Sequence, residues 1–427
     1  MKKTRINNFE ESLYYEELEN GLKVYAVPIK NKKNFSAMMV IKYGGRDINF
    51  KIGDKVCQTP TGIAHFLEHK MFERKDDPFS FYGKYGTDVN AATSDDYTCY
   101  YFTGNKCFNK SLKYLLNWIQ TLDITEKQVK KEQGIILEEA SMYKDNPSRV
   151  MYNKVKENIY VNDPKQHKVI GTDEDIVKIT KEDLDLCYKN FYVPNNMSLI
   201  VTGNVNPKEV ISIARDYTKG FKPVKEKAIP IYSAEPDNVN KEYDELYMNV
   251  GIPKVNISYK INKEHFDSLK ITPFELDLYM HFIINICLGV TSDIRGVWLE
   301  KELFTNAFYR IIEIESHYVI ELHADSQKPD ELLKELEKYM LNLKINKDSF
   351  EREKKSWISS EIKAIENSMT ILYNILDDLL DYNSFISNKI DYIKKLKFET
   401  LLRIIDLLDL SNKTVIKILP LQSKDKK

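Results

Sequence analysis

The sequence predicts an α+β fold built from two tandem, similar domains, each a mostly antiparallel sheet with helices packed on one face. Runs rich in β-branched and aromatic residues alternate with long amphipathic stretches. The helical and strand periodicity stops between residues 221 and 240, and the second half then repeats the element order of the first. With 427 residues, 42% of them hydrophobic, the chain can bury more than one core.

The first half opens with two predicted strands, residues 22–28 and 35–43, which flank a lysine-rich turn at 30–33. Because the turn between them is short, we expect these two strands to pair with each other. The next predicted elements are a helix around 65–69, a turn at 83–86, strands within 89–102, helices over 111–122 and 126–143, a strand at 197–201 and a helix from 207.

The domain boundary is predicted where Pro223, Pro230 and Pro236 lie among charged and small residues, as in an exposed linker. We therefore expect an N-terminal domain over 1–222, a linker over 223–240 and a C-terminal domain over 241–427. The elements predicted after the linker are strands within 245–261, a helix over 273–288, strands at 308–314 and 318–324, charged helices over 329–382 and a strand at 414–419. The lysine- and glutamate-rich helices are expected to form solvated outer faces.

Composition excludes several classes of protein. Lys and Arg number 63 against 64 Asp and Glu, so the chain lacks the basic field that nucleic-acid binding needs. The first residues carry lysines without an apolar run behind them, and the strongly apolar stretch at 280–290 is too short to span a bilayer, so we expect a cytoplasmic protein with no membrane partner. Five cysteines without C-x-x-C spacing argue against a disulfide framework or a cysteine metal site.

The pentapeptide HFLEH contains His65, Glu68 and His69. On a helix that turns about 100° per residue, the two histidines lie about 40° apart with the glutamate beside them. Two neutral imidazoles can hold zinc, and an adjacent carboxylate can act as the base for a water molecule that the metal activates. Since the flanking residues are apolar nearly all round, these three polar groups need buried partners, which a metal ion would provide. The order H-x-x-E-H is the inverzincin arrangement.

Two histidines are too few for a hydrolytic zinc site, which usually has three protein ligands. On the predicted helix 126–143, Glu132 and Glu139 fall on the same stripe as the apolar Ile136, whereas Glu138 points away. A carboxylate on an inward stripe is costly unless it is paired or metal-bound. Periodicity leaves open which of Glu132 and Glu139 binds the metal.

Four segments together resemble the pitrilysin/insulinase family of zinc peptidases. They are GIAHFLEHKMFE (62–73), GTDVNAATSDDYTCYYF (86–102), EQGIILEEASMYKDNP (132–147) and VPNNMSLIVTGNV (193–205). The similarity is strong and ordered over the first half and weaker over the second. It implies a zinc metalloendopeptidase whose two domains form half of a clamshell and which binds peptides or unfolded segments.

The resemblance also implies residue roles. His65, His69 and Glu139 match the ligands of one Zn²⁺ per chain, Glu68 matches the general base, and Glu132 matches a catalytic-site carboxylate that orients a ligating histidine. The strand that begins near Val89 would be a sheet edge on which substrate adds as an extra strand. Asn90 and Ala91 are the matching substrate-binding positions.

The sequence departs from the family pattern in the second half. Active members usually carry a Leu-Arg step with a tyrosine seven residues after the arginine, but Glu300 and Ala307 occupy those places here. Arg295, Tyr309 and Arg310 lie nearby but out of register. Because such an arginine–tyrosine pair helps to stabilise the oxyanion, its absence predicts weak catalysis by the chain alone.

In the bacterial two-subunit members that this chain resembles, a sister subunit without the zinc motif supplies that pair. We therefore expect the zinc-bearing half of a heterodimer, or a dimer with a second copy of the chain. Removal of a leader from a ribosomally made peptide is one task that the family analogy suggests.

Two other functions compete with this one. A catalytically inactive structural or binding subunit is favoured by the missing pair and disfavoured by the intact set of imidazoles and carboxylates. A zinc hydrolase that acts on a non-peptide amide is disfavoured by the edge-strand interpretation.

Overall fold

The computed structural model describes residues 1–7 and 9–421 and divides the chain into two compact units. Unit 1 comprises 1–140, 167–232 and 360–389, and unit 2 comprises 141–166, 233–359 and 390–427. The change of unit at Tyr232 falls inside the expected linker at 223–240. The units are nevertheless not the continuous halves 1–222 and 241–427, because each contains a segment from the other half of the chain.

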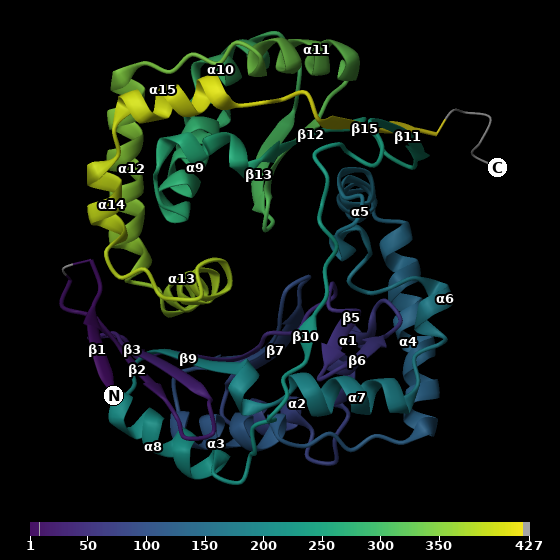
Figure 1. Cartoon of the computed structure of the whole chain (residues 1–427), viewed down its shortest axis with the longest axis vertical. Helices are drawn as coiled ribbons and strands as arrows, with labels where there is room; N and C mark the ends of the chain where they lie inside the picture. The colour runs from purple at the N-terminus through teal and green to yellow at the C-terminus, as the bar shows by residue number, and fades with distance from the viewer. Residues whose placement is uncertain (8, 422–427) are drawn as a thin grey trace. The chain divides into compact units, whose positions relative to one another are not determined.

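Unit 1 is built on a seven-stranded sheet with the strand order β1-β2-β3-β9-β4-β8-β7 (Figure 1). Only the β3–β9 pair is parallel, so this sheet is mostly antiparallel, as predicted. Its strands are β1 (Lys2–Arg5), β2 (Ser12–Glu17), β3 (Lys23–Pro28), β4 (Phe35–Ile41), β7 (Asp88–Thr93), β8 (Thr98–Gly104) and β9 (Met197–Gly203). A smaller sheet has the order β10-β5-β6, with β5 (Asn49–Ile52), β6 (Lys55–Gln58) and β10 (Ile229–Pro230).

The helices of unit 1 include the two that carry the sequence motifs, α1 (Ile63–Phe72) and α4 (Glu126–Lys144), the latter running past the unit boundary. The others are α2 (Pro78–Gly83), α3 (Phe108–Ile119), α6 (Asp173–Ile176), α7 (Lys181–Phe191), α8 (Pro207–Thr218) and α13 (Ser368–Asp381).

The expected pairing of the first two strands is wrong. Strand β9 lies between β3 and β4, parallel to β3 and antiparallel to β4. The sequence signal for both strands was correct, but their common neighbour comes from about 160 residues further along the chain, and local periodicity carries no information about such a partner.

Helix α13 also departs from expectation, because it is not a solvated outer helix. Its Ile371, Leu372, Ile375 and Leu376 are buried in one core with residues of β3, β4, β8 and β9. All seven residues of β4 are buried, and α3 and α8 lie on the opposite side of the sheet from α13 (Figure 1). This sheet therefore has helices on both faces, one of them from the second half of the chain.

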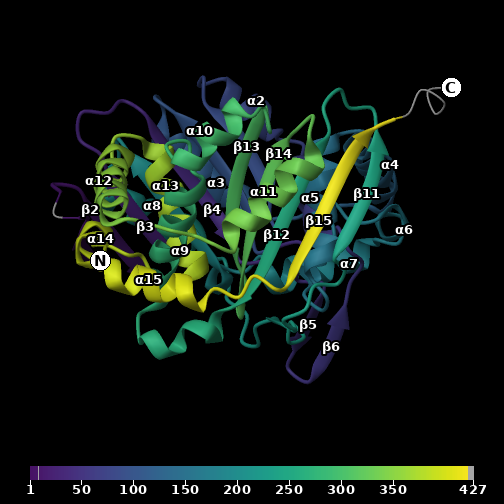
Figure 2. The same ribbon diagram turned by 90° about the horizontal axis from the view of Figure 1, so that it is seen from above.

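Unit 2 is built on a five-stranded sheet with the order β11-β15-β12-β14-β13, which Figure 2 shows from above. Its strands are β11 (Tyr243–Met248), β12 (Lys254–Asn262), β13 (Asn306–Glu313), β14 (His317–Asp325) and β15 (Lys413–Pro420). Its helices are α5 (Pro147–Ile159), α9 (Pro273–Leu288), α10 (Asp293–Glu300), α11 (Pro329–Met340) and α15 (Phe398–Leu407), with α12 (Lys347–Ala364) and α14 (Lys389–Lys395) crossing the unit boundary.

Helix α5 completes unit 2 although it belongs to the first half of the sequence. Its Met151, Val155 and Ile159 share a core with Ile416 and Ile418 of β15. Such an exchange follows when each sheet has an apolar face that the helices of its own half leave uncovered.

Within residues 1–7 and 9–421, one helical stretch, Pro273–Glu300, is long and apolar enough to cross a membrane by length and composition. The apolar run is thus longer than the sequence interpretation assumed. In the structure it is interrupted, since α9 ends at Leu288 and α10 begins at Asp293. Core helices of soluble proteins meet the same criterion, and α9 is buried on several sides within unit 2.

Candidate metal site

Helix α1 starts where the backbone requires a glycine. Gly62 precedes the helix with φ of 88°, and a Cβ there would lie 2.4 Å from the carbonyl oxygen of Ile170. Glycine alone adopts this conformation without strain and permits the close approach. At its other end the helix is anchored by Trp118, whose indole N–H donates to the carbonyl of Met71 at 2.6 Å. The apolar residues of α1 other than Phe72 are buried, so the helix is packed into unit 1.

Helix α4 presents the carboxylates as the predicted stripe requires. Glu132 is buried along with Ile136, Glu139 is partly buried, and Glu138 is exposed. Since Glu132 and Glu139 are seven residues apart, about two helical turns separate them on one face. Both therefore face α1 at different levels.

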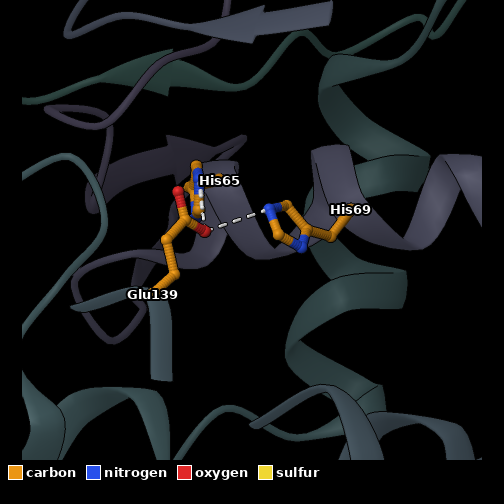
Figure 3. Close-up of side chains that lie close together, drawn as sticks. All are labelled: His65, His69 and Glu139. Carbon is orange, nitrogen blue, oxygen red and sulfur yellow. Dashed lines mark ion pairs between the residues drawn. The ribbon is translucent and has the colours of Figure 1, made fainter. Parts of the chain in front are cut away.

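His65, His69 and Glu139 converge at one point, as Figure 3 shows. Their candidate ligand atoms all lie within 4.8 Å of one another. One oxygen of Glu139, Oε2, is 3.7 Å from Nε2 of His65 and 3.5 Å from Nε2 of His69. Among the described residues, this is the one group of three or more His, Cys, Asp or Glu side chains whose ligand atoms lie this close together.

These separations fit a tetrahedral ion better than direct hydrogen bonds. Ligand bonds of about 2.0–2.2 Å at the tetrahedral angle put ligand atoms about 3.3–3.6 Å apart. The observed 3.5 Å lies within that range and 3.7 Å lies just above it, and both exceed the usual N–H···O distance. Nδ1 of His65 is buried, and no described residue forms a hydrogen bond with it.

Glu132 lies on the far side of His69 from this point of convergence. Its Oε1 is 3.1 Å from Nδ1 of His69, the ring nitrogen opposite the one that faces Glu139. Its Oε2 is 3.4 Å from the ammonium of Lys70, which also forms an ion pair with Glu73. The structure thus separates the two carboxylates that periodicity left equivalent: Glu139 faces both imidazoles, and Glu132 bonds to the back of one.

Glu68 accepts a hydrogen bond from Thr93, whose hydroxyl lies 2.6 Å from Oε2. Thr93 ends strand β7, which packs against α1. This contact links the proposed base to the end of the edge strand.

The pKa shifts follow from burial and from these contacts. Burial, reinforced by the neighbouring charge of His69, lowers the pKa of His65 to about 4. Burial opposes the charge on His69, but its bond to Glu132 and nearby carboxylates outweigh that effect and raise its pKa. Burial raises the pKa of Glu68, although the Thr93 hydroxyl partly counteracts it. A carboxylate with a raised pKa is better suited to accept and return a proton near neutral pH.

Two residues of this site were missed from the sequence. Lys70 is a charged residue that lies beside the HFLEH motif in a helix whose remaining residues are apolar, and that mismatch was the available signal. Thr93 gave no local signal, because its contact with Glu68 depends on how α1 packs against β7.

Asn90 and Ala91 lie on β7, which is the edge of the seven-stranded sheet, as expected for that strand. They pair with Tyr101 and Tyr100 of β8 on the inner side. Asn90 is exposed, and its side-chain oxygen accepts from the backbone N–H of Ala91 at 2.9 Å. Neither residue belongs to the His65–His69–Glu139 group.

In unit 2, Glu300 is exposed at the end of α10, and Ala307 lies on β13. The candidates out of register are engaged locally. Arg295 donates to the carbonyl of Ala307 at 2.7 Å, and Tyr309 donates to Oδ1 of Asn285 at 2.8 Å. Both side chains are therefore already used in holding α9, α10 and β13 together.

Comparison with known families agrees with the motifs. The model described as "Insulinase (Peptidase family M16)" matches residues 57–173, which contain the site. The model described as "Peptidase M16 inactive domain" matches residues 178–356. The two tandem matches correspond to the duplicated architecture predicted from the sequence.

Individual relatives agree with the family matches. "Uncharacterized zinc protease YmfH" from Bacillus subtilis (strain 168) is 32% identical over 379 residues, 86% of this chain and 87% of that protein. "Zinc protease PqqE" from Helicobacter pylori is 31% identical over 51% of this chain and 50% of that protein. An M16-like peptidase structure from Alicyclobacillus acidocaldarius has a TM-score of 0.89 at 26% identity, covering 97% of this chain and 99% of that one. The chain therefore belongs to the insulinase family, peptidase family M16.

Proposed function

We propose that this protein is a zinc-dependent endopeptidase that hydrolyses peptides or unfolded segments. The observation that carries the proposal is the convergence of His65, His69 and Glu139, whose candidate ligand atoms all lie within 4.8 Å of one another, with Oε2 of Glu139 3.7 and 3.5 Å from Nε2 of the two imidazoles. Relatives named as zinc proteases support the same metal and the same class of reaction.

His65, His69 and Glu139 are the proposed ligands of a single Zn²⁺. Two neutral imidazoles and one carboxylate are a common ligand set of hydrolytic zinc sites, and they leave a position for substrate or water. Bound zinc would supply a Lewis acid that makes water more acidic and polarises the peptide carbonyl.

Glu68 is the proposed general base and acid. Its carboxylate takes the proton from the attacking water and then delivers it to the amine of the leaving peptide. Thr93 holds one carboxylate oxygen, Oε2, which leaves Oε1 for proton transfer. Glu132 is proposed to act through His69 by fixing its ring orientation from Nδ1.

The substrate is proposed to extend along β7 at Asn90 and Ala91. An edge strand offers unpaired main-chain groups that can bind many sequences in one register. In the present conformation the Asn90 side chain occupies the N–H of Ala91, so an added strand would displace that contact.

We further propose that the active form is a pair of subunits in which this chain supplies the zinc. Glu300 and Ala307 stand where an arginine and a tyrosine are expected, and Arg295 and Tyr309 are bound within unit 2. A sister subunit without the zinc motif would supply the arginine and the tyrosine. A second copy of this chain would form the pair but would carry the same Glu300 and Ala307. Processing of a ribosomally made peptide and a cytoplasmic location stay predictions.

The decisive experiment compares metal content and peptide cleavage in three variants. Glu68→Gln should bind zinc like the native chain and lose peptidase activity by several orders of magnitude, because the proton acceptor is gone. His65→Ala should lose both. Glu138→Gln, on the exposed side of α4, is the matched control and should change neither. Full turnover by Glu68→Gln would remove the proposed base.

A structural or binding subunit is the second candidate, favoured by Glu300 and Ala307. Under that function the native chain would cleave no peptide either alone or with its sister subunit, with or without added zinc.

A further inference from the structure

Lys70 is an unusual residue for its position, because its ammonium is buried in unit 1. The residue is 1% exposed and lies in α1 directly after His69. Burying an ammonium is costly unless nearby groups compensate its charge, and an apolar side chain would fill this position without that cost. The compensation comes from Glu73, in an ion pair, and from Glu132 at 3.4 Å.

The carboxylate of Glu132 is held at both oxygens by consecutive residues of α1. Oε1 contacts Nδ1 of His69 at 3.1 Å, and Oε2 contacts Nζ of Lys70 at 3.4 Å. Glu132 itself is buried.

We propose that Lys70 is a positioning residue for the zinc site, acting through Glu132 on His69. The inference rests on the proposed zinc function, and it adds a residue that is not itself one of the proposed metal ligands His65, His69 and Glu139.

The physical reason is the number of fixed points. A carboxylate bound at one oxygen can rotate about its terminal torsion, whereas one bound at both oxygens keeps a single orientation. With Glu132 fixed, its Oε1 holds Nδ1 of His69, and the opposite nitrogen, Nε2, keeps facing Glu139. The same bridge ties α1 to α4 two turns before Glu139.

The test measures zinc affinity by chelator competition in Lys70→Met, Lys70→Arg and the double variant Lys70→Met/Glu132→Gln. Lys70→Met should bind zinc about 10- to 100-fold more weakly, as for other groups that orient a ligating histidine. Lys70→Arg retains the charge and should recover most of that affinity. When Glu132→Gln is already present, the further change Lys70→Met should have little effect, because the two residues act in one chain of contacts.

Lys260→Met is the matched control. Lys260 is also 1% exposed and paired with a buried carboxylate, Glu235, but it lies in unit 2. The substitution Lys260→Met should lower the midpoint of thermal unfolding without changing zinc affinity. The visible spectrum of the Co²⁺-substituted protein gives a second reading, since an altered His69 orientation changes the ligand geometry and a general loss of stability does not.

The outcomes separate this inference from the proposed function. A native chain that binds no zinc would defeat the zinc function itself. Native zinc binding together with unchanged affinity in Lys70→Met would overturn the role of Lys70 alone. If Lys70→Met fails to fold, the zinc affinity of Glu132→Gln is compared with that of the double variant, because the double variant has neither the Lys70 ammonium nor the Glu132 carboxylate. A further large loss of zinc affinity in the double variant would overturn the inference.

Discussion

The hydroxyl of Thr93 is predicted to set the acid limb of the pH–rate profile through Glu68. The substitution Thr93→Val removes the donor and nearly preserves shape. In the structure the Thr93 hydroxyl lies 2.6 Å from Oε2 of Glu68, within the range of a strong hydroxyl-to-carboxylate hydrogen bond. Burial already raises the pKa of Glu68, and this hydrogen bond is the contact that opposes the increase most strongly.

The magnitude follows from the class of bond. A hydrogen bond to a charged group contributes about 1.5–3 kcal/mol, and it stabilises the ionised form of Glu68 alone. Its loss therefore raises the pKa of Glu68 further. On the acid limb, where the base must first lose a proton, kcat/KM should fall roughly 10- to 150-fold, at 1.36 kcal/mol per tenfold. Well above the pKa, where Glu68 is ionised in both proteins, the rates should converge.

The assay is the pH dependence of kcat/KM for a fluorogenic peptide, measured on the zinc-loaded chain with its partner subunit if one is required. Thr93→Ser keeps the donor and is the control, so its acid limb should stay close to that of the native protein. A Thr93→Val limb that coincides with the native one would refute the coupling. An equal loss of rate at every pH would instead show that Thr93 positions the helix without affecting the ionisation of Glu68.

Two further predictions concern the scaffold. Gly62→Ala should lower the free energy of unfolding by at least about 1–2 kcal/mol, because alanine is strained at the left-handed φ of Gly62, and the close approach to the Ile170 carbonyl should lower it further. The control is Gly134→Ala in α4, where a Cβ meets nothing within 4 Å, and it should be neutral or stabilising. Urea unfolding measures both variants, and equal midpoints would contradict the steric argument. Leu372 in α13 is fully buried, so Leu372→Ala should lower the free energy of unfolding by about 2–5 kcal/mol. Leu402 is exposed, so Leu402→Ala should change it little. A small effect of Leu372→Ala would mean that α13 is not part of the unit 1 core.

Much of the candidate site could be predicted because its parts are local. His65, Glu68 and His69 share one face through the geometry of a single helix, and Glu132 and Glu139 share another through a spacing of seven residues. The helix bounds followed for the same reason, with α4 predicted over 126–143 and observed as Glu126–Lys144.

Contacts between elements were beyond this reasoning. Which carboxylate of α4 faces the imidazoles depends on how α1 and α4 cross. Periodicity alone assigned Glu132 and Glu139 to the same stripe. The bridge from Lys70 to Glu132 and the bond from Thr93 to Glu68 depend on the same packing.

The sequence by itself determined which side chains share a face, because backbone hydrogen bonding fixes the repeat of a helix or strand regardless of what surrounds it. It also determined the family, through motifs spread over four segments. Only the tertiary structure decided that β9 separates β3 from β4, that α13 and α5 complete sheets in the opposite halves of the chain, and that Glu139 faces both histidines. Those choices depend on complementarity between surfaces far apart in the sequence, and no local pattern records which two surfaces will meet.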